Sequence, residues 1–302
     1  MFVRIIVAAT TLALTGCITV SGEDGQPGLP GMRGDQQAFV DACEPWDDWD
    51  KPAPPFKVHA NTYYVGTCGI AAILIADAEG HILLDSGTEA GARIVASNVS
   101  TAGFELGDVQ LLGFSHEHFD HVGGMAYLQD VTGAALVSLK AGAEVMRTGA
   151  SDPGDPQHGT HEPFKPVRVD FVHEDGDAMG AGSLLARSFA TPGHTPGATT
   201  WQWEACDGED CKTIVYADSL SPVSADDYRF SDHLEYVAEY RAGLEKIANL
   251  ECDILLTPHP SHSKMLERME ARRLEGGMSC AEYATGKVRR LDKRLAQEAE
   301  SE

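Results

Sequence analysis

The chain alternates short apolar runs with helical patterns, and the alternation occurs in two successive rounds. Continuous or alternating apolar runs predict strands, and apolar residues three and four positions apart predict helices. In the first round we expect strands at 63–65, 70–76, 81–84, 109–114 and 135–139, with helices at 90–99, 125–130 and 141–147. A Pro/Gly/His-rich loop at 148–166 precedes a second round, with strands at 167–173, 183–190, 199–204, 213–217 and 254–257 and helices at 234–248, from 264 and at 281–297. This order predicts an α/β protein, an αββα four-layer sandwich in which two mixed β-sheets carry helices on their outer faces.

Metal-ligand side chains are concentrated directly after the apolar run 109–114. They are His116, His118, Asp120 and His121, in Ser-His-Glu-His-Phe-Asp-His-Val-Gly-Gly. In extended chain, residues two apart face the same side, so His116 and His118 can bind one ion. The turn that follows brings Asp120 and His121 beside a neighbouring position. Isolated histidines are usually surface or core residues, but this density at a strand end predicts a metal site.

Two further strand ends carry a histidine in a stiff, proline-rich turn. His194 lies in Thr-Pro-Gly-His-Thr-Pro-Gly, and His259 lies in Thr-Pro-His-Pro. We expect two ions. One would be bound by His116, His118 and His194, and the other by Asp120, His121 and His259. Three protein ligands per ion leave a position for water, which is typical of a catalytic site. Imidazole and carboxylate without thiolate favour two Zn²⁺ per chain over iron or manganese.

Three other histidines are alternatives for binding roles. His262 follows His259 by three residues and competes with it as a ligand, although the Pro-His-Pro context favours His259. His158 and His161 lie in the 148–166 loop, where solvent exposure is the default and a substrate or third-metal role is the alternative.

The amino-terminal residues predict export. Arg4 precedes an apolar run at 5–14, too short to span a bilayer, so residues 1–16 are expected to be a signal peptide. Leu-Thr-Gly-Cys ending at Cys17 resembles the bacterial lipobox, which implies a lipidated Cys17. Ile18 then favours the outer membrane of a Gram-negative bacterium, on the periplasmic side; the alternative is a plain secretory signal.

Glycine stands at every third position of a collagen-like segment between residues 22 and 34. The segment is too short to hold three chains together, so we interpret residues 17–37 as a flexible tether to a domain at 38–302, with a trimer as the alternative. The formal net charge of -23 argues against nucleic-acid binding and would not attract an anionic substrate. We expect a monomer.

Seven cysteines are present, and six remain if Cys17 carries lipid. An even number in an exported chain suggests disulfide bonds. Cys206 and Cys211 bracket a tight turn between two predicted strands and would clip a hairpin. The natural local choices for the others are Cys43 with Cys68 and Cys252 with Cys280.

The metal motif, with His194 and His259 downstream, is similar to that of the metallo-β-lactamase superfamily over residues 39–297. Asp85 in Leu-Asp-Ser-Gly matches the superfamily's first motif, in which an aspartate braces the metal turn from outside the ligand set. The absence of a cysteine ligand, Gly-His-Thr-Pro-Gly at 193–197, Tyr-Ala-Asp-Ser-Leu-Ser at 216–221 and Thr-Pro-His-Pro at 257–260 together resemble subclass B3 of the class B β-lactamases.

The resemblance implies a β-lactam substrate site beside the ions. Ser219 and Ser221 would hold the substrate carboxylate, and the pocket walls would be Trp46, Trp49, Phe119 and the loop around Gln157. In thioester hydrolases of the same superfamily an aspartate comparable with Asp218 bridges the metals; the two serines that follow Asp218 here favour the lactamase arrangement, with Asp218 outside the ligand set.

The expected activity is hydrolysis of penicillins, cephalosporins and carbapenems by a metal-bound hydroxide, which would confer antibiotic resistance. Two ions about 3.5–4 Å apart can lower the pKa of a shared water to about 7. The ion of His116, His118 and His194 would polarise the carbonyl, and Asp120 would orient the hydroxide. The alternatives are another hydrolase of this superfamily, acting on a thioester, lactone or ester, and a zinc-binding lipoprotein without activity.

Overall fold

A computed structural model describes residues 36–300, and the predicted signal peptide lies outside that range. The first helix, α1 (Gln36–Ala42), includes the last two residues of the predicted tether, and the rest of the tether lies outside the described residues. Among the described helices, none has both the length and the apolar character needed to cross a bilayer.

The first sheet has seven strands in sequence order. They are β1 (Phe56–His59), β2 (Thr62–Tyr64), β3 (Ile73–Ile75), β4 (His81–Leu84), β5 (Val109–Gly113), β6 (Ala135–Leu139) and β7 (Val169–His173). Neighbours from β1 to β4 are antiparallel, and those from β4 to β7 are parallel. The sheet is therefore mixed, and the carboxyl ends of β4 and β5 meet at one edge.

The second sheet has five strands in the order β12-β11-β10-β9-β8. They are β12 (Ile254–Leu256), β11 (Asp210–Tyr216), β10 (Thr199–Asp207), β9 (Leu184–Ala190) and β8 (Ala178–Ala181). β12 runs parallel to β11, and the other neighbours are antiparallel.

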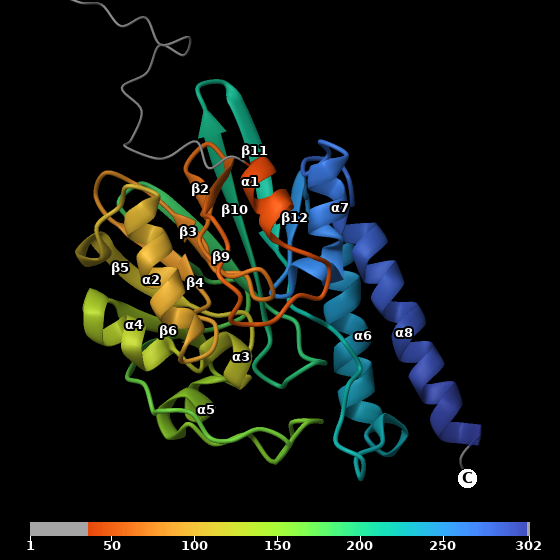
Figure 1. Cartoon of the computed structure of the whole chain (residues 1–302). Helices are drawn as coiled ribbons and strands as arrows, with labels where there is room; N and C mark the ends of the chain where they lie inside the picture. Colours follow the sequence, from red (N-terminus) through yellow and green to blue (C-terminus); the bar gives the residue numbers. More distant parts are fainter. Residues whose placement is uncertain (1–35, 301–302) are drawn as a thin grey trace, which may run out of the picture.

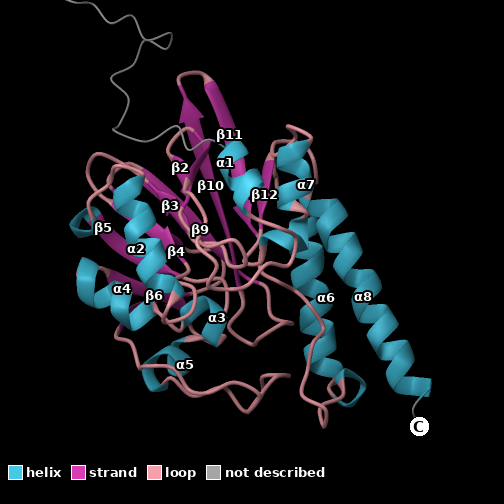
Figure 2. Cartoon of the chain, viewed as in Figure 1, coloured by secondary structure: helices cyan, strands magenta, loops and turns pink. Residues whose placement is uncertain are grey.

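Helices cover the outer face of each sheet, and the two sheets face each other (Figure 1, Figure 2). On the first sheet lie α2 (Gly91–Thr101), α4 (Met125–Thr132) and α5 (Ala143–Thr148); on the second lie α6 (Leu234–Ala248) and α8 (Cys280–Glu300), with α7 (Met265–Glu270) beside β12. The short α3 (Phe119–Val122) belongs to the metal turn. The predicted four-layer α/β sandwich is confirmed.

Three apolar clusters correspond to the three interfaces between the layers. One lies between the sheets and includes Ile73, Leu84 and Trp201. The second joins the first sheet to α2 and α4, and the third joins the second sheet to α6 and α8. Each sheet is covered on both faces. Because successive side chains of a strand point to opposite faces, nearly every side chain of a central strand is buried, which explains the nearly continuous apolar runs.

Three disulfide bonds join Cys43 to Cys68, Cys206 to Cys211 and Cys252 to Cys280. These are the local pairings expected. The second bond lies between directly opposed residues of β10 and β11. The third fixes the start of α8 to the segment that leads into β12.

Candidate metal centre

The metal turn is held at the end of β5 by a buried carboxylate. Asp85 accepts hydrogen bonds from the Ser115 backbone N–H (2.6 Å), the Ser115 hydroxyl (2.7 Å) and the Tyr216 hydroxyl (2.6 Å). Asp85 itself has a left-handed backbone, with a φ of 62°. Since all three residues are fully buried, the residues that follow Ser115 leave the strand in a fixed direction.

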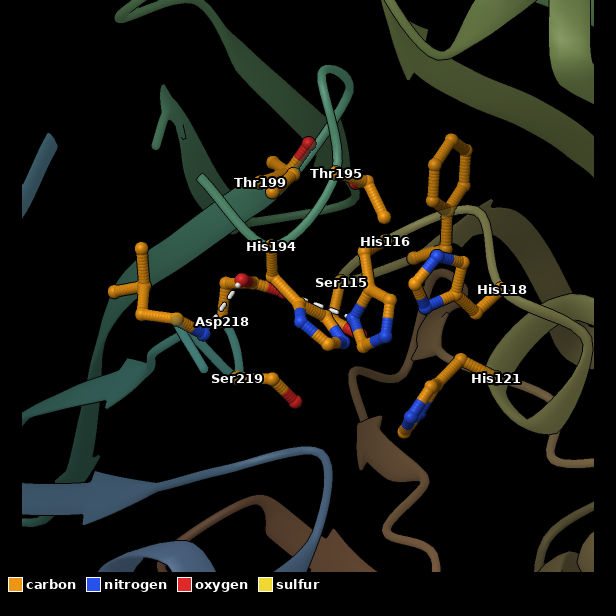
Figure 3. Close-up of polar contacts among 12 residues, drawn as sticks. Ser115, His116, His118, His121, His194, Thr195, Thr199, Asp218 and Ser219 are labelled. Atoms are coloured by element: carbon orange, nitrogen blue, oxygen red, sulfur yellow. Dashed lines mark hydrogen bonds and ion pairs between the residues drawn. The ribbon is translucent and has the colours of Figure 1, made fainter. Parts of the chain in front are cut away.

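The first ligand triad consists of His116, His118 and His194. One ring nitrogen from each residue lies within 4.8 Å of the others, and all three side chains are buried. The ring centroid of His194 is 4.8 Å from that of His118 and 4.6 Å from that of His116, although the β9–β10 turn that carries His194 is remote in sequence. The close-up shows these rings gathered on one side of Asp218 and Ser219 (Figure 3).

The second triad is tighter and joins the two sheets. Asp120 Oδ2 lies 3.1 Å from His121 Nε2 and 3.2 Å from His259 Nε2, and the two Nε2 atoms are 3.4 Å apart. The ligand atoms of His116, Asp120 and His121 also lie within 4.8 Å of one another, so the two triads adjoin.

In each ligand histidine, the ring nitrogen that is not assigned to an ion lies close to an oxygen atom or a backbone group. His116 Nδ1 is hydrogen-bonded to Ser115 Oγ at 3.2 Å and lies 2.9 Å from Asp218 Oδ1, and His121 Nδ1 lies 3.4 Å from Asp85 Oδ2; the two carboxylate contacts are close but are not hydrogen bonds. The remaining partners are Asp155 Oδ2 for His118 Nε2 (2.9 Å), the Ser221 carbonyl for His194 Nδ1 (2.9 Å) and the backbone of Gly69 for His259. Partners of this kind set the tautomer, so that the free nitrogen can donate its lone pair to a cation.

The electrostatic environment differs among the ligands within each triad. Burial opposes charge on His118, but Asp155 outweighs it and raises the pKa of His118, whereas burial lowers the pKa of His259. Burial, together with neighbouring histidines, holds the pKa values of His116 and His194 well below the usual histidine range. Burial opposes charge on Asp120 and His121 too, but their mutual attraction outweighs it: the pKa of Asp120 is lowered well below its usual value and that of His121 is raised to about 10. A cation entering the second triad would therefore displace a proton from His121.

Glu117, between the two histidines of the metal turn, joins that turn to the turn that carries His194. Its carboxyl accepts hydrogen bonds from the Thr195 hydroxyl (2.7 Å) and the Gly197 N–H (2.8 Å). Glu117 is buried, and burial raises its pKa. This contact holds the first sheet's ligands against the second sheet's ligand.

A cavity of about 460 Å³ opens over both triads. It is lined by His118, Asp120, His194 and His259, by the predicted wall residues Trp46, Trp49 and Gln157, and by Ser221, which was expected to hold the substrate carboxylate. The lining does not include two other predicted substrate contacts. Ser219 is fully buried, and the partly buried Phe119 packs against the core cluster of the first sheet. A cavity of similar size near α1 and α7 has none of the triad residues in its lining.

The other histidines lie around the triads without joining them. His262 also lines the cavity; its ring centroid is 5.1 Å from that of His259, and its Nδ1 is buried without a hydrogen-bond partner. His161 lines the cavity 5.4 Å from the ring of His118, whereas the Nδ1 of the exposed His158 bonds Ser151 within its own loop.

Some residues that shape the site could not be identified from the sequence. Asp155 lies in the 148–166 loop and is identified only by its contact with His118. Lys287, in an exposed-looking helical pattern, is 3% exposed and reaches Ser219 and Ser221.

Comparison with known proteins agrees with the family that the sequence motifs resemble. The model of the metallo-beta-lactamase superfamily matches residues 65–259. The MIM-2 metallo-beta-lactamase structure is 54% identical over 89% of this chain and 99% of its own, with a TM-score of 0.84. The MIM-1 enzyme from Novosphingobium pentaromativorans is 43% identical over 88% of this chain and 99% of its own, with a TM-score of 0.85. MEM-A1, a subclass B3 enzyme from a soil metagenome library, is 38% identical over 84% and 100%, with a TM-score of 0.81.

The chain therefore belongs to the metallo-β-lactamase superfamily. Within it, the structures that it resembles are B3 metallo-β-lactamases, and the buried histidines and aspartate form the metal site of that enzyme class. Among curated proteins, the hydroxyacylglutathione hydrolase of Bradyrhizobium sp. (strain ORS 278) is 26% identical over 153 residues. That match covers 48% of this chain and 49% of the relative, so the chain spans about half the length of the curated relatives that it matches.

Proposed function

We propose that this protein is a zinc-dependent β-lactamase that hydrolyses the cyclic amide of penicillins, cephalosporins and carbapenems. The observation that carries the proposal is the pair of adjoining ligand triads beneath one open cavity. The identity of 54% with a metallo-β-lactamase over most of both chains supports it.

The residues fit two divalent cations. His116 Nε2 is buried and has no hydrogen-bond partner among the described residues, although its Nδ1 side is partnered. Such an orphaned nitrogen is costly unless a cation accepts its lone pair. A donor set of imidazoles and one carboxylate, with all described cysteines in disulfides, suits Zn²⁺ better than softer or harder metals. We assign the first ion to His116, His118 and His194 and the second to Asp120, His121 and His259.

When bound, the ions supply Lewis acidity and lower the pKa of water at the site to about 7. Hydrolysis adds the OH of one water to the carbonyl carbon and its remaining proton to the amide nitrogen as the C–N bond breaks. Asp120 directs Oδ2 to His121 and His259, so its other oxygen can orient the attacking water and carry that proton. Ser221 lines the cavity; its hydroxyl donates to the Ser219 carbonyl at 3.3 Å and can rotate to donate to the substrate carboxylate instead. Trp46 and Trp49 can cover the apolar part of the substrate.

We also propose that the protein acts in the periplasm, attached to the outer membrane through lipidated Cys17. The lipobox-like sequence supports the attachment, and three disulfide bonds support an oxidising compartment. Membrane fractionation of the Cys17→Ser variant tests this. Release of the variant into the soluble periplasmic fraction is expected, and equal membrane association of both proteins would contradict it.

The activity is tested by carbapenem and cephalosporin hydrolysis with the purified protein, its chelator-treated form, and His118→Ala and Asp120→Ala. Each variant removes a ligand, so the loss in kcat/KM should exceed the roughly 10–100-fold typical of losing an outer partner of a ligand. Asp130→Ala removes an exposed carboxylate on α4 and should retain activity. Full turnover in either ligand variant, or in the chelated protein, would refute the proposal.

The curated relative favours one alternative, hydrolysis of a hydroxyacyl glutathione thioester. Asp218 argues against it, because its carboxylate faces Nδ1 of His116, away from the free Nε2, and accepts from the Leu220 N–H at 3.0 Å. A thioester in the same assay separates the two: preferential thioester hydrolysis would replace the β-lactamase proposal.

A further inference from the structure

Lys287 is a buried lysine without a carboxylate partner. Within residues 36–300 it forms no ion pair; its Nζ donates instead to the Ser219 carbonyl and to the Ser221 Oγ at 3.0 Å. Tyr283, one turn earlier on α8, donates to the carbonyls of Asp218 (2.7 Å) and Ser219 (3.0 Å). Together these two side chains hold the segment from which Ser221 faces the cavity, including the left-handed Leu220 with a φ of 44°.

Arg290 lies three residues further along α8, on the same side of the helix as Lys287. It is exposed, has no ion-pair partner in the described part of the chain, and is the one Arg or Lys that lines the cavity over the triads. Ser221, Pro222 and Val223 line the same cavity. The guanidinium is thus available to a ligand in the cavity that Ser221 also lines.

The charge of the whole chain makes this position significant. A formal net charge of -23 produces a surface that repels anions, while the bicyclic β-lactams carry a carboxylate next to the lactam nitrogen. Asp120 is the one carboxylate in the lining of the cavity. Besides the two proposed Zn²⁺ ions, Arg290 is the cationic side chain that the cavity offers to a substrate anion, and a guanidinium has two parallel N–H donors that match a carboxylate.

We propose that α8 supplies the subsite for the substrate carboxylate, with Arg290 binding the anion directly and Lys287 positioning the Ser221 hydroxyl beside it. This inference rests on the proposed β-lactamase activity. Lys287 needs only its N–H donors for this role, and burial, then the nearby Arg290, lowers its pKa well below the usual lysine value.

The test compares a chromogenic cephalosporin with the methyl ester of its carboxylate. The preference, defined as kcat/KM for the acid divided by kcat/KM for the ester, should fall at least about tenfold in Arg290→Ala, through KM for the acid. The ester should be hydrolysed as before, and Arg290→Lys should restore part of the preference. Arg289→Ala is the matched control, because it removes an equal charge from the next, exposed residue of α8, outside the cavity lining.

A double-mutant cycle tests the positioning role of Lys287. If Lys287 acts through Ser221, the effects of Lys287→Met and Ser221→Ala on the acid-to-ester preference should be non-additive. A general loss of stability would instead lower kcat/KM equally for the acid and the ester and leave the preference unchanged. An unchanged preference in Arg290→Ala overturns the inference while leaving the β-lactamase proposal intact. Absence of hydrolysis of both substrates by the unmodified protein overturns the proposed activity itself.

Discussion

Asp155 offers a sharp test of how the first triad is prepared for a metal. Its carboxylate is 2% exposed and lies 2.9 Å from His118 Nε2, so that Nδ1 of the same ring is left for the cation. Asp155→Ala leaves a buried ring nitrogen without an acceptor and releases the tautomer. Loss of such a partner typically weakens metal affinity by about 10–100-fold, or roughly 1.4–2.8 kcal/mol.

The affinity is measured by competition with a chromophoric zinc chelator, together with metal content after dialysis. Asp155→Asn keeps one oxygen acceptor but loses the charge and should fall between Asp155→Ala and the unmodified protein. Asp130→Ala, an exposed carboxylate on α4, should bind two ions as before. If Asp155→Ala kept both ions at unchanged affinity, the tautomer argument would be wrong.

Two further predictions concern the residues that join the turns and support the second sheet. Glu117→Ala should lower the free energy of unfolding by about 1–3 kcal/mol for each hydrogen-bond donor left unpaired. Glu117→Gln resembles the neutral acid that burial favours, so its melting temperature should be close to that of the unmodified protein. Equal melting temperatures for the two variants would contradict this. Because burial lowers the pKa of Lys287, the folded protein binds fewer protons than the unfolded chain. The free energy of unfolding due to this residue therefore rises with pH, by up to about 1.4 kcal/mol per pH unit, until the pH reaches the ordinary lysine pKa of about 10.4. Lys287→Met lacks that slope, so chemical denaturation at pH 7 and 9 should show the variant's stability relative to the unmodified protein decreasing as pH rises; a parallel dependence would argue against a neutral Lys287.

The apolar pattern predicted the layers because most central strands are buried on both faces. It missed β1 and β8, which are edge strands: β8 alternates exposed and buried residues around small side chains, and β1 combines polar and apolar positions near a proline pair. It also missed α1, a single short helix with one fully buried side chain. Such elements are stabilised by tertiary contacts that a local pattern does not contain.

The ligand residues could be predicted because metal chemistry restricts residue type and because each ligand follows a strand end. Their outer partners could not. Asp155 is one of many acidic residues in this chain, and only the folded loop brings it to His118. Phe119 and Ser219 were assigned to the substrate by resemblance, and neither lines the cavity: Ser219 is fully buried, and the partly buried Phe119 packs against the core cluster of the first sheet. The direction of a side chain leaving a tight turn depends on the backbone there, which a local pattern does not contain.

The bond between Cys43 and Cys68 closes the segment that carries Trp46 and Trp49, at a sequence separation of 25. Neither tryptophan is deeply buried, since they are 62% and 43% exposed. The disulfide holds their segment over the cavity together with two hydrogen bonds, from the Trp46 N–H to Ser261 Oγ and from the Thr67 hydroxyl to the Trp49 carbonyl. In a chain that folded before oxidation, the metal ligands would assemble while the tryptophan segment kept only these non-covalent contacts. Oxidation thus restricts the movement of the substrate-binding surface without contributing a ligand to the metal site.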